Sequence, residues 1–133
     1  MLFRSMKSIM DSGAKVGFGS DFPTDPTTFS PIENIEALVT RTAIAGRGGV
    51  DGEPEDAFVH NPEECLSVED VIRGYTINNA YQMGKEDVLG SIEPGKNADF
   101  TVLDRNIFEI DPHEIHAARV MQTIKDGITT YKA

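Results

Sequence analysis

The sequence has few of the features that mark membrane, secreted or nucleic-acid-binding proteins. It has no apolar run near the roughly 18 residues that would span a bilayer, and its first residues lack a signal peptide's apolar block and cleavage site. A single cysteine, Cys65, excludes an internal disulfide and a multi-cysteine metal site. Only 12 Lys and Arg oppose 22 Asp and Glu, and the net charge of −10 disfavours nucleic acid and anionic lipid as partners. We therefore expect a cytoplasmic protein that binds neither nucleic acid nor membrane.

The composition is that of a folded domain. The 133 residues leave room for one ordinary domain, and 39% of them are apolar while 26% are charged. No internal repeat and no low-complexity tract interrupts the chain. These proportions predict a soluble, acidic α/β or α+β protein.

The N-terminal part predicts a helix followed by a strand. Apolar residues recur at helical spacing over residues 2–11, and Gly13 is a reasonable helix stop. The short, glycine-containing run at residues 15–19 is typical of the buried centre of a parallel sheet. Helix, loop and strand in succession suggest the repeating unit of an α/β fold.

Two further helices have clear start signals. Ser30 and Pro31 begin the first, Glu33 completes a capping box, and the apolar stripe runs to about Ala45. The following residues 46–65 are rich in glycine, proline and acids and predict a long loop, which is typical of functional lids or mobile excursions.

The next helix begins at a second capping box. Ser67 caps it, Asp70 completes the box, and Leu66 can pack on Val71 as a hydrophobic staple. The apolar stripe of this helix predicts that it continues to Gly84.

The rest of the chain predicts strands and tight turns. Residues 93–96 are a type II turn signal, and residues 100–103 form a predicted strand. A hairpin is predicted for residues 121–131 around Asp126-Gly127. We expect an α/β portion to about residue 83 and an all-β tail after it. Neither portion has enough strands to complete a sheet, so we expect a fragment of something larger or an obligate oligomer.

Asp21 is the first candidate for chemistry. It ends the predicted buried strand, where α/β barrels and open sheets build active sites, and Pro23 then turns the chain away. A helix cap or loop carboxylate is the alternative, and spacing alone does not choose between the two. Asp25, beside Pro26, is typical of a turn.

The other candidates have weaker patterns. His113 and His116 would share a helix face and could bind a metal, but neither they nor His60 lies in an HxH or HExxH pattern, which favours solvated surface histidines. Cys65 has no histidine nearby in sequence, which favours a core or interface role. The glycines of residues 46–52 lack the GK[ST] of a phosphate loop.

Three blocks of the chain resemble one family. Residues 13–23, GAKVGFGSDFP, are similar to the last barrel strand of metal-dependent amidohydrolases of the amidohydrolase-3 branch. Residues 66–81, from LSVEDV to YTINNAY, resemble the helix that follows that barrel. Residues 89–100, LGSIEPGKNADF, and the closing hairpin at 123–131 resemble strands of its small β-sandwich. The resemblance extends over nearly the whole chain, in the family's order.

The resemblance implies a fold and a metal centre. Family members have a (β/α)8 barrel, a β-sandwich built from both chain ends, and a catalytic divalent metal, for which we expect zinc. Their ligands are an early His-x-His, a later lysine or acid, two more histidines and the aspartate that ends the last strand. Asp21 matches that aspartate, and by resemblance it contacts the metal and acts as general base toward the bridging water. None of the histidines here matches a ligand position, and Thr24 stands where many members have an aliphatic residue.

The resulting hypothesis is an α/β chain that is the C-terminal fragment of a (β/α)8 TIM barrel followed by β-sandwich strands. Residues 1–83 would be barrel units, and residues 84–133 would belong to the sandwich. The parent would hydrolyse carbon–nitrogen bonds other than peptide bonds in a small amide or cyclic amide, and the isolated chain would be inactive. We expect a homo-oligomer or pairing with the missing barrel portion.

Two alternatives stay open. One is a non-catalytic regulatory or interaction module, since some members of the branch are named exoenzyme regulators. The other is an enzyme assembled from two or more chains. For Tyr75, Asn78, Lys96 and Asp99 we expect structural roles in packing, turns and the start of a strand.

Overall fold

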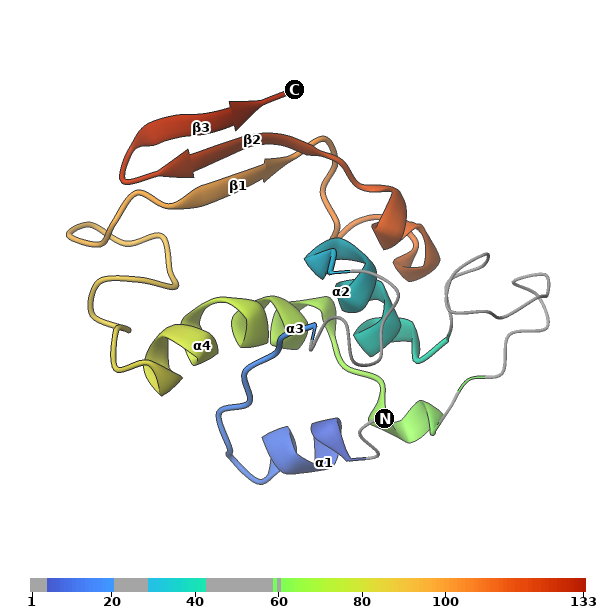
Figure 1. The fold of residues 1–133 in the computed structure, drawn as a ribbon. Coiled ribbons are helices and arrows are strands. Elements are labelled where there is room, and N and C mark those ends of the chain that lie inside the picture. Colours follow the sequence, from blue (N-terminus) through green and yellow to red (C-terminus); the bar gives the residue numbers. More distant parts are fainter. Residues whose placement is uncertain (1–4, 21–28, 43–58, 60) are drawn as a thin grey trace.

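The computed structural model describes residues 5–20, 29–42, 59 and 61–133. The helices gather on one side of a small antiparallel sheet (Figure 1). In chain order the described elements are helices α1 (Met6–Asp11) and α2 (Pro31–Thr40), the 3-10 helix η2 (Pro62–Glu64), helices α3 (Val68–Tyr75) and α4 (Ile77–Gln82), strand β1 (Phe100–Leu103), the 3-10 helix η3 (Pro112–Ala117), and strands β2 (Val120–Lys125) and β3 (Ile128–Lys132).

The first two predicted helices form, with changes at their ends. Helix α1 is followed by Gly13 with φ +92°, a conformation that glycine adopts without strain. Helix α2 begins at Pro31 as predicted, but Ser30 makes no side-chain capping bond to it. It ends at Thr40, earlier than the predicted Ala45, because Arg41 takes a left-handed conformation with φ 54°.

The third predicted helix is divided in two. Ser67 caps it as predicted, with the Asp70 N–H donating to Ser67 Oγ at 3.1 Å, while the Asp70 carboxylate accepts from the Ser67 hydroxyl at 2.6 Å. The helix does not continue unbroken to Gly84, because the backbone of Thr76 leaves helical geometry at φ −121° and ψ −95°. The Thr76 hydroxyl donates to the Ile72 carbonyl at 2.7 Å, and α4 starts at the next residue.

The tail forms the predicted strands and turns. The strand order is β1-β2-β3, with both pairs antiparallel. Asp126 and Gly127 have φ of 50° and 77°, the two positive values that a type I′ hairpin turn requires. In the turn at 93–96, the Lys96 N–H donates to the Glu93 carbonyl at 3.2 Å and Gly95 has φ +95°. The expectation of an all-β tail is wrong in one respect, since η3 lies between β1 and β2.

The predicted strand at residues 15–19 does not form. Residues 14–20 are neither helix nor strand. The reason is the lack of a neighbour, since the three tail strands are the only strands among the described residues and they pair with one another. The expected parallel sheet is therefore absent from the described part of the chain.

One apolar core joins elements from both ends of the chain. Its buried members come from residues 14–20, α2, the start of α3 and the excursion between β1 and β2, namely Phe18, Ile35, Leu66, Val71, Ile107, Ile115 and Ala118. Val71 and Ile115 are fully buried. Residues on both sides of position 83 thus contribute to one cluster.

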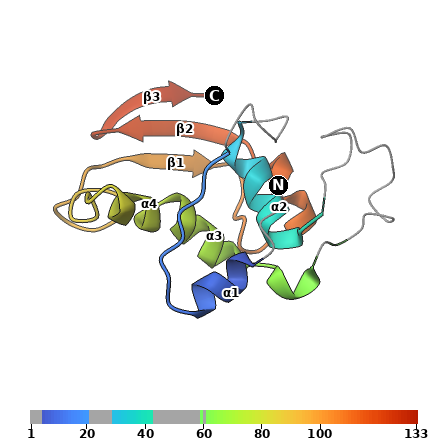
Figure 2. The same ribbon diagram turned by 60° about the horizontal axis from the view of Figure 1, so that its bottom comes forward.

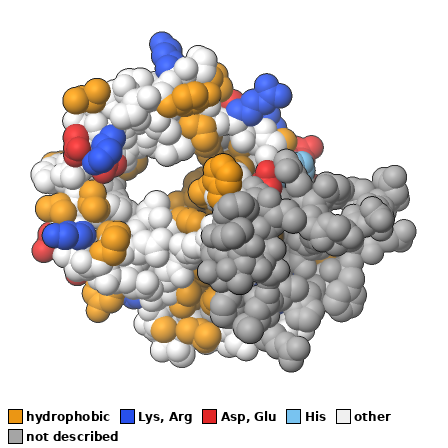
Figure 3. Space-filling model, in the orientation of Figure 1, with side chains coloured by type: hydrophobic (Ala, Val, Ile, Leu, Met, Phe, Trp, Pro, Cys, Tyr) orange, Lys and Arg blue, Asp and Glu red, His pale blue; other side chains and the backbone are white. Residues whose placement is uncertain are grey.

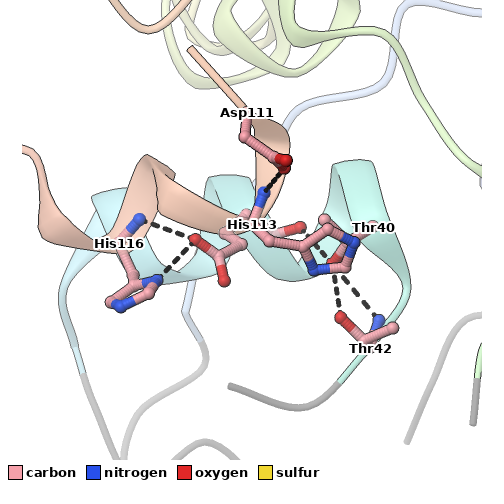
Figure 4. A network of polar contacts seen from close by, with 6 residues as sticks. Thr40, Thr42, Asp111, His113 and His116 are labelled. Carbon is pink, nitrogen blue, oxygen red and sulfur yellow. Dashed lines mark hydrogen bonds and ion pairs between the residues drawn. The ribbon is translucent and has the colours of Figure 1, made fainter. Parts of the chain in front are cut away.

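A buried carboxylate joins α2 to η3. Glu36 is 3% exposed, and its Oε2 accepts the His116 backbone N–H at 2.7 Å. The same oxygen lies 2.8 Å from Nδ1 of the His116 ring. Figure 4 shows both contacts as dashed lines from His116 toward α2. The buried charge is thereby hydrogen-bonded, as a carboxylate out of water requires.

The sheet itself is largely uncovered. Every residue of β3 is exposed, including Ile128 at 70% and Tyr131 at 50%. Figure 3 shows an opening between the sheet and the helices below it, with apolar side chains scattered over the described part of this face. No helix among the described residues is long and apolar enough to cross a membrane.

Helix α1 is capped from far along the chain. Ser5, at its N-cap, makes no side-chain capping bond. The Ser8 N–H instead donates to Glu64 Oε2 at 3.1 Å, and the Ser8 hydroxyl donates to the other oxygen of the same carboxylate. These bonds hold the pKa of the Glu64 carboxyl below its usual range. Glu64 thus ties α1 to η2 across 56 positions of sequence.

We expect Glu64→Gln to destabilise the chain at neutral pH. A carboxyl with a lowered pKa in the folded state contributes stability above its unfolded pKa and loses it as the pH falls through the folded pKa. Urea unfolding should therefore show a lower midpoint for the variant at pH 7, and the difference should vanish in acid. The matched control is Glu63→Gln, at an exposed neighbour. A Glu64→Gln midpoint equal to that of the wild type at pH 7 would contradict the capping role.

Candidate functional site

The candidate catalytic residue, Asp21, lies outside the described residues, as does His60. The described part of the site is the segment that leads to Asp21, residues 14–20, and the helices that hold it. Figure 2 shows this segment leaving α1 and running beside α3 and α4.

Side-chain amides of α4 bind the backbone of this segment. Asn78 Nδ2 donates to the Val16 carbonyl at 2.9 Å, and Asn79 Nδ2 donates to the Phe18 carbonyl at 2.9 Å. The Phe18 N–H donates in turn to the Gly74 carbonyl of α3 at 3.2 Å. Three hydrogen bonds therefore satisfy backbone groups that a neighbouring strand would satisfy in a sheet.

Two glycines allow the close approach of segment and helix. A Cβ at Gly74 would lie 2.2 Å from Cδ2 of the Phe18 ring. A Cβ at Gly17 would lie 2.1 Å from Asn79 Oδ1. A side chain at residue 74 would displace the buried Phe18 ring, and one at residue 17 would displace the side-chain end of Asn79.

Phe18 anchors the segment in the core. It is buried, and its ring centroid lies 5.9 Å from that of Tyr75 in a tilted arrangement. Burial raises the pKa of the Tyr75 hydroxyl, so this residue stays neutral at ordinary pH. Ordering the segment therefore combines apolar burial with hydrogen bonds to the backbone.

The described histidines have roles outside this segment. The His113 N–H donates to Asp111 Oδ1 at 2.9 Å, which caps η3. His116 is exposed at the surface as expected, and its Nδ1 also contacts the buried Glu36 carboxylate at 2.8 Å. Within the described ranges no three His, Cys, Asp or Glu residues come close enough to hold a metal ion.

Other expected structural roles are confirmed. The Lys96 ammonium donates to the Glu86 carbonyl at 2.5 Å and to Ser91 Oγ at 2.6 Å, so it closes the loop before β1. Asp99 Oδ1 accepts the Asp126 N–H at 2.7 Å and fixes the hairpin turn against the start of β1. Cys65 is half-buried, with Sγ 3.8 Å from the Thr40 carbonyl oxygen.

The sequence reasoning missed the importance of three residues. Asn79 and Gly74 hold the segment, and Glu36 binds η3. A signal existed for Glu36, because it lies four positions after Ile32 on the apolar stripe of α2, where a carboxylate needs a partner. The roles of Asn79 and Gly74 depend on contacts with residues more than 50 positions away. The spacing of neighbouring residues in the sequence carries no information about such contacts.

Comparison with known proteins gives one family. The sequence model of the Amidohydrolase family matches residues 2–131. The chain is 33% identical over 127 residues to N-substituted formamide deformylase of Arthrobacter pascens, covering 96% of this chain and 21% of that protein. It is 34% identical over 130 residues to imidazolonepropionase of Clostridium tetani, covering 98% and 26% respectively.

A solved structure agrees in fold. The crystal structure of an amidohydrolase from Thermotoga maritima MSB8 superposes with a TM-score of 0.61 at 22% identity, covering 96% of this chain and 25% of that one. The chain thus spans about a fifth to a quarter of the length of the proteins it matches.

We expect Gly74→Ala to destabilise the chain. The added methyl would raise helix propensity by up to about 1 kcal/mol, but overpacking against Phe18 should cost about 1–3 kcal/mol and prevail. Gly19→Ala is the control, because a Cβ there meets no atom within 4 Å. Urea unfolding of both variants measures the difference in free energy. Equal stability of Gly74→Ala and wild type would show that Phe18 does not occupy this position.

Proposed function

Because the chain belongs to the amidohydrolase family, we propose that it is part of a hydrolase that cleaves carbon–nitrogen bonds other than peptide bonds. The observation that carries this proposal is the family match over residues 2–131, which includes the sequence Gly19-Ser20-Asp21. Two relatives are named for an N-substituted formamide and for imidazolonepropionate. A small amide or cyclic amide is therefore the proposed substrate class.

Asp21 is the proposed catalytic residue. An aspartate is ionised near neutral pH, so its carboxylate can take a proton from water as the water oxygen bonds to the carbonyl carbon. The same proton can then pass to the nitrogen as the carbon–nitrogen bond breaks. The products are a carboxylic acid and an amine, or the ring-opened acid when the amide is cyclic. The anchored segment 14–20 supports this role, since Asp21 directly follows it in the chain.

A divalent metal, zinc in our proposal, belongs to the family's chemistry. A catalytic zinc site usually takes about three protein ligands, and the described residues hold no group of three candidate ligands. The described part of the chain thus does not fit a metal centre by itself. Asp21 would be one ligand, and the others would come from residues beyond those described or from the rest of a longer protein.

The proposed architecture follows from the same family. Residues 1–83 would belong to the end of a (β/α)8 barrel and residues 84–133 to a β-sandwich. The exposure of β3 and the opening beside the sheet support pairing with further barrel and sandwich elements or with a second copy. We propose that the 133 residues alone do not hydrolyse substrate. The exposed β3 also supports a second candidate, a non-catalytic interaction module that binds a partner along this strand.

We expect Asp21→Asn to lower the turnover of an N-substituted formamide by at least about 100-fold, because a general base typically contributes that much. The assay uses the full-length protein with zinc and follows amine release, and circular dichroism checks the fold. Asp25→Asn is the matched control, four residues further on. Full turnover by a folded Asp21→Asn variant would overturn the catalytic role of Asp21.

A further inference from the structure

We propose that Asn78 and Asn79 are positioning residues, whose side-chain amides set the path of the backbone that delivers Asp21. The inference rests on the proposed function, because it assigns these amides to the same catalytic carboxylate. It goes further by naming the groups that fix the carboxylate's backbone from a helix more than 50 positions away in sequence.

The pattern of hydrogen bonds is that of a substitute strand. In an extended chain the N–H and C=O of one residue point to the same side, and alternate residues share that side. The bonded groups here belong to alternate residues, the Val16 carbonyl and both the N–H and the carbonyl of Phe18. Helices α3 and α4 therefore bind these three groups along one edge of the segment. Gln82 Nε2 of α4 also reaches the Lys15 carbonyl, which belongs to the other set of alternate residues, at 3.4 Å.

The contacts leave the segment little freedom to slide. A shift by one residue would move Phe18 out of the core and bring Gly17 or Gly19 into its place. A residue with a Cβ at the position of Gly17 would have to displace the amide of Asn79. Register is thus fixed by burial of the Phe18 ring, by the absent side chain of Gly17, and by the two amides.

The amides act on backbone and not on side chains. Asn78 is 8% exposed, so its amide is withheld from water and donates to the Val16 carbonyl instead. Loss of such a buried donor leaves the carbonyl unsatisfied and frees the chain to move. Only Gly19 and Ser20 separate Phe18 from Asp21, so a displacement at Phe18 is carried along two residues to the carboxylate. A misplacement near 1 Å costs a catalytic group about 100-fold in rate.

The test replaces the amide donor by a carboxylate of the same shape. Asn78→Asp turns the donor into an acceptor that repels the Val16 carbonyl, and Asn79→Asp does the same at Phe18, in case the first variant does not fold. Asn97→Asp is the matched control, because Asn97 is exposed in the loop before β1 and its side chain makes no hydrogen bond to residues 14–20 in the described part of the chain. All variants are made in the full-length protein.

Two readouts are measured, steady-state hydrolysis of an N-substituted formamide and hydrogen exchange of peptides over residues 16–22. We expect each Asn→Asp variant to lower kcat by about 100-fold with KM within about threefold, and to speed exchange in these peptides while those of the β-sheet are unchanged. Asn97→Asp should change neither quantity by more than about threefold.

Each other outcome overturns the proposal. Faster exchange with normal kcat would leave the amides a structural role only, and a lower kcat with unchanged exchange would mean that backbone position is not the cause. An equal loss in Asn97→Asp would show a non-specific effect of charge. The proposed function fails separately, if Asp21→Asn retains full turnover.

Discussion

Hydrogen bonds from side-chain amides to backbone carbonyls are the interactions on which the site depends. Residues 14–20 have no neighbouring strand among the described residues, and a segment buried without backbone partners would be costly. Asn78, Asn79 and the carbonyl of Gly74 supply those partners. The Phe18 ring can then enter the core without leaving buried polar groups of its own backbone unpaired.

The same solution recurs elsewhere in the chain. Glu64 caps α1 from 56 positions away, and Glu36 binds His116 from 80 positions away. In each case a carboxylate on one element accepts hydrogen bonds from a second element that is distant in sequence. These contacts join the helices to each other and to the excursion between β1 and β2, around a core of few fully buried side chains. The sheet takes little part in this core, which is consistent with a chain that pairs with further elements.

Local sequence signals predicted most of the helices, strands and turns. The predictions failed where contacts between residues distant in sequence determine the structure. The Ser67 cap and the Asp126-Gly127 hairpin depend on residues a few positions apart, and both form. The strand at 15–19 was predicted from a pattern that needs a partner, and the described residues offer none. The helix break at Thr76 lies where α4 must turn its amides toward the segment, a requirement that spacing does not express. The family resemblance was confirmed over residues 2–131, while the role of Asp21 stays a prediction.

Hydrogen exchange at single amides tests the seating of residues 14–20 most directly. The Phe18 N–H donates to the Gly74 carbonyl, whereas the neighbouring N–H groups of Gly17 and Gly19 donate to no group among the described residues. Exchange measured by NMR should therefore be slow at Phe18 and fast at Gly17 and Gly19. Equal, fast exchange at all three amides would contradict the docking of this segment on α3 and α4.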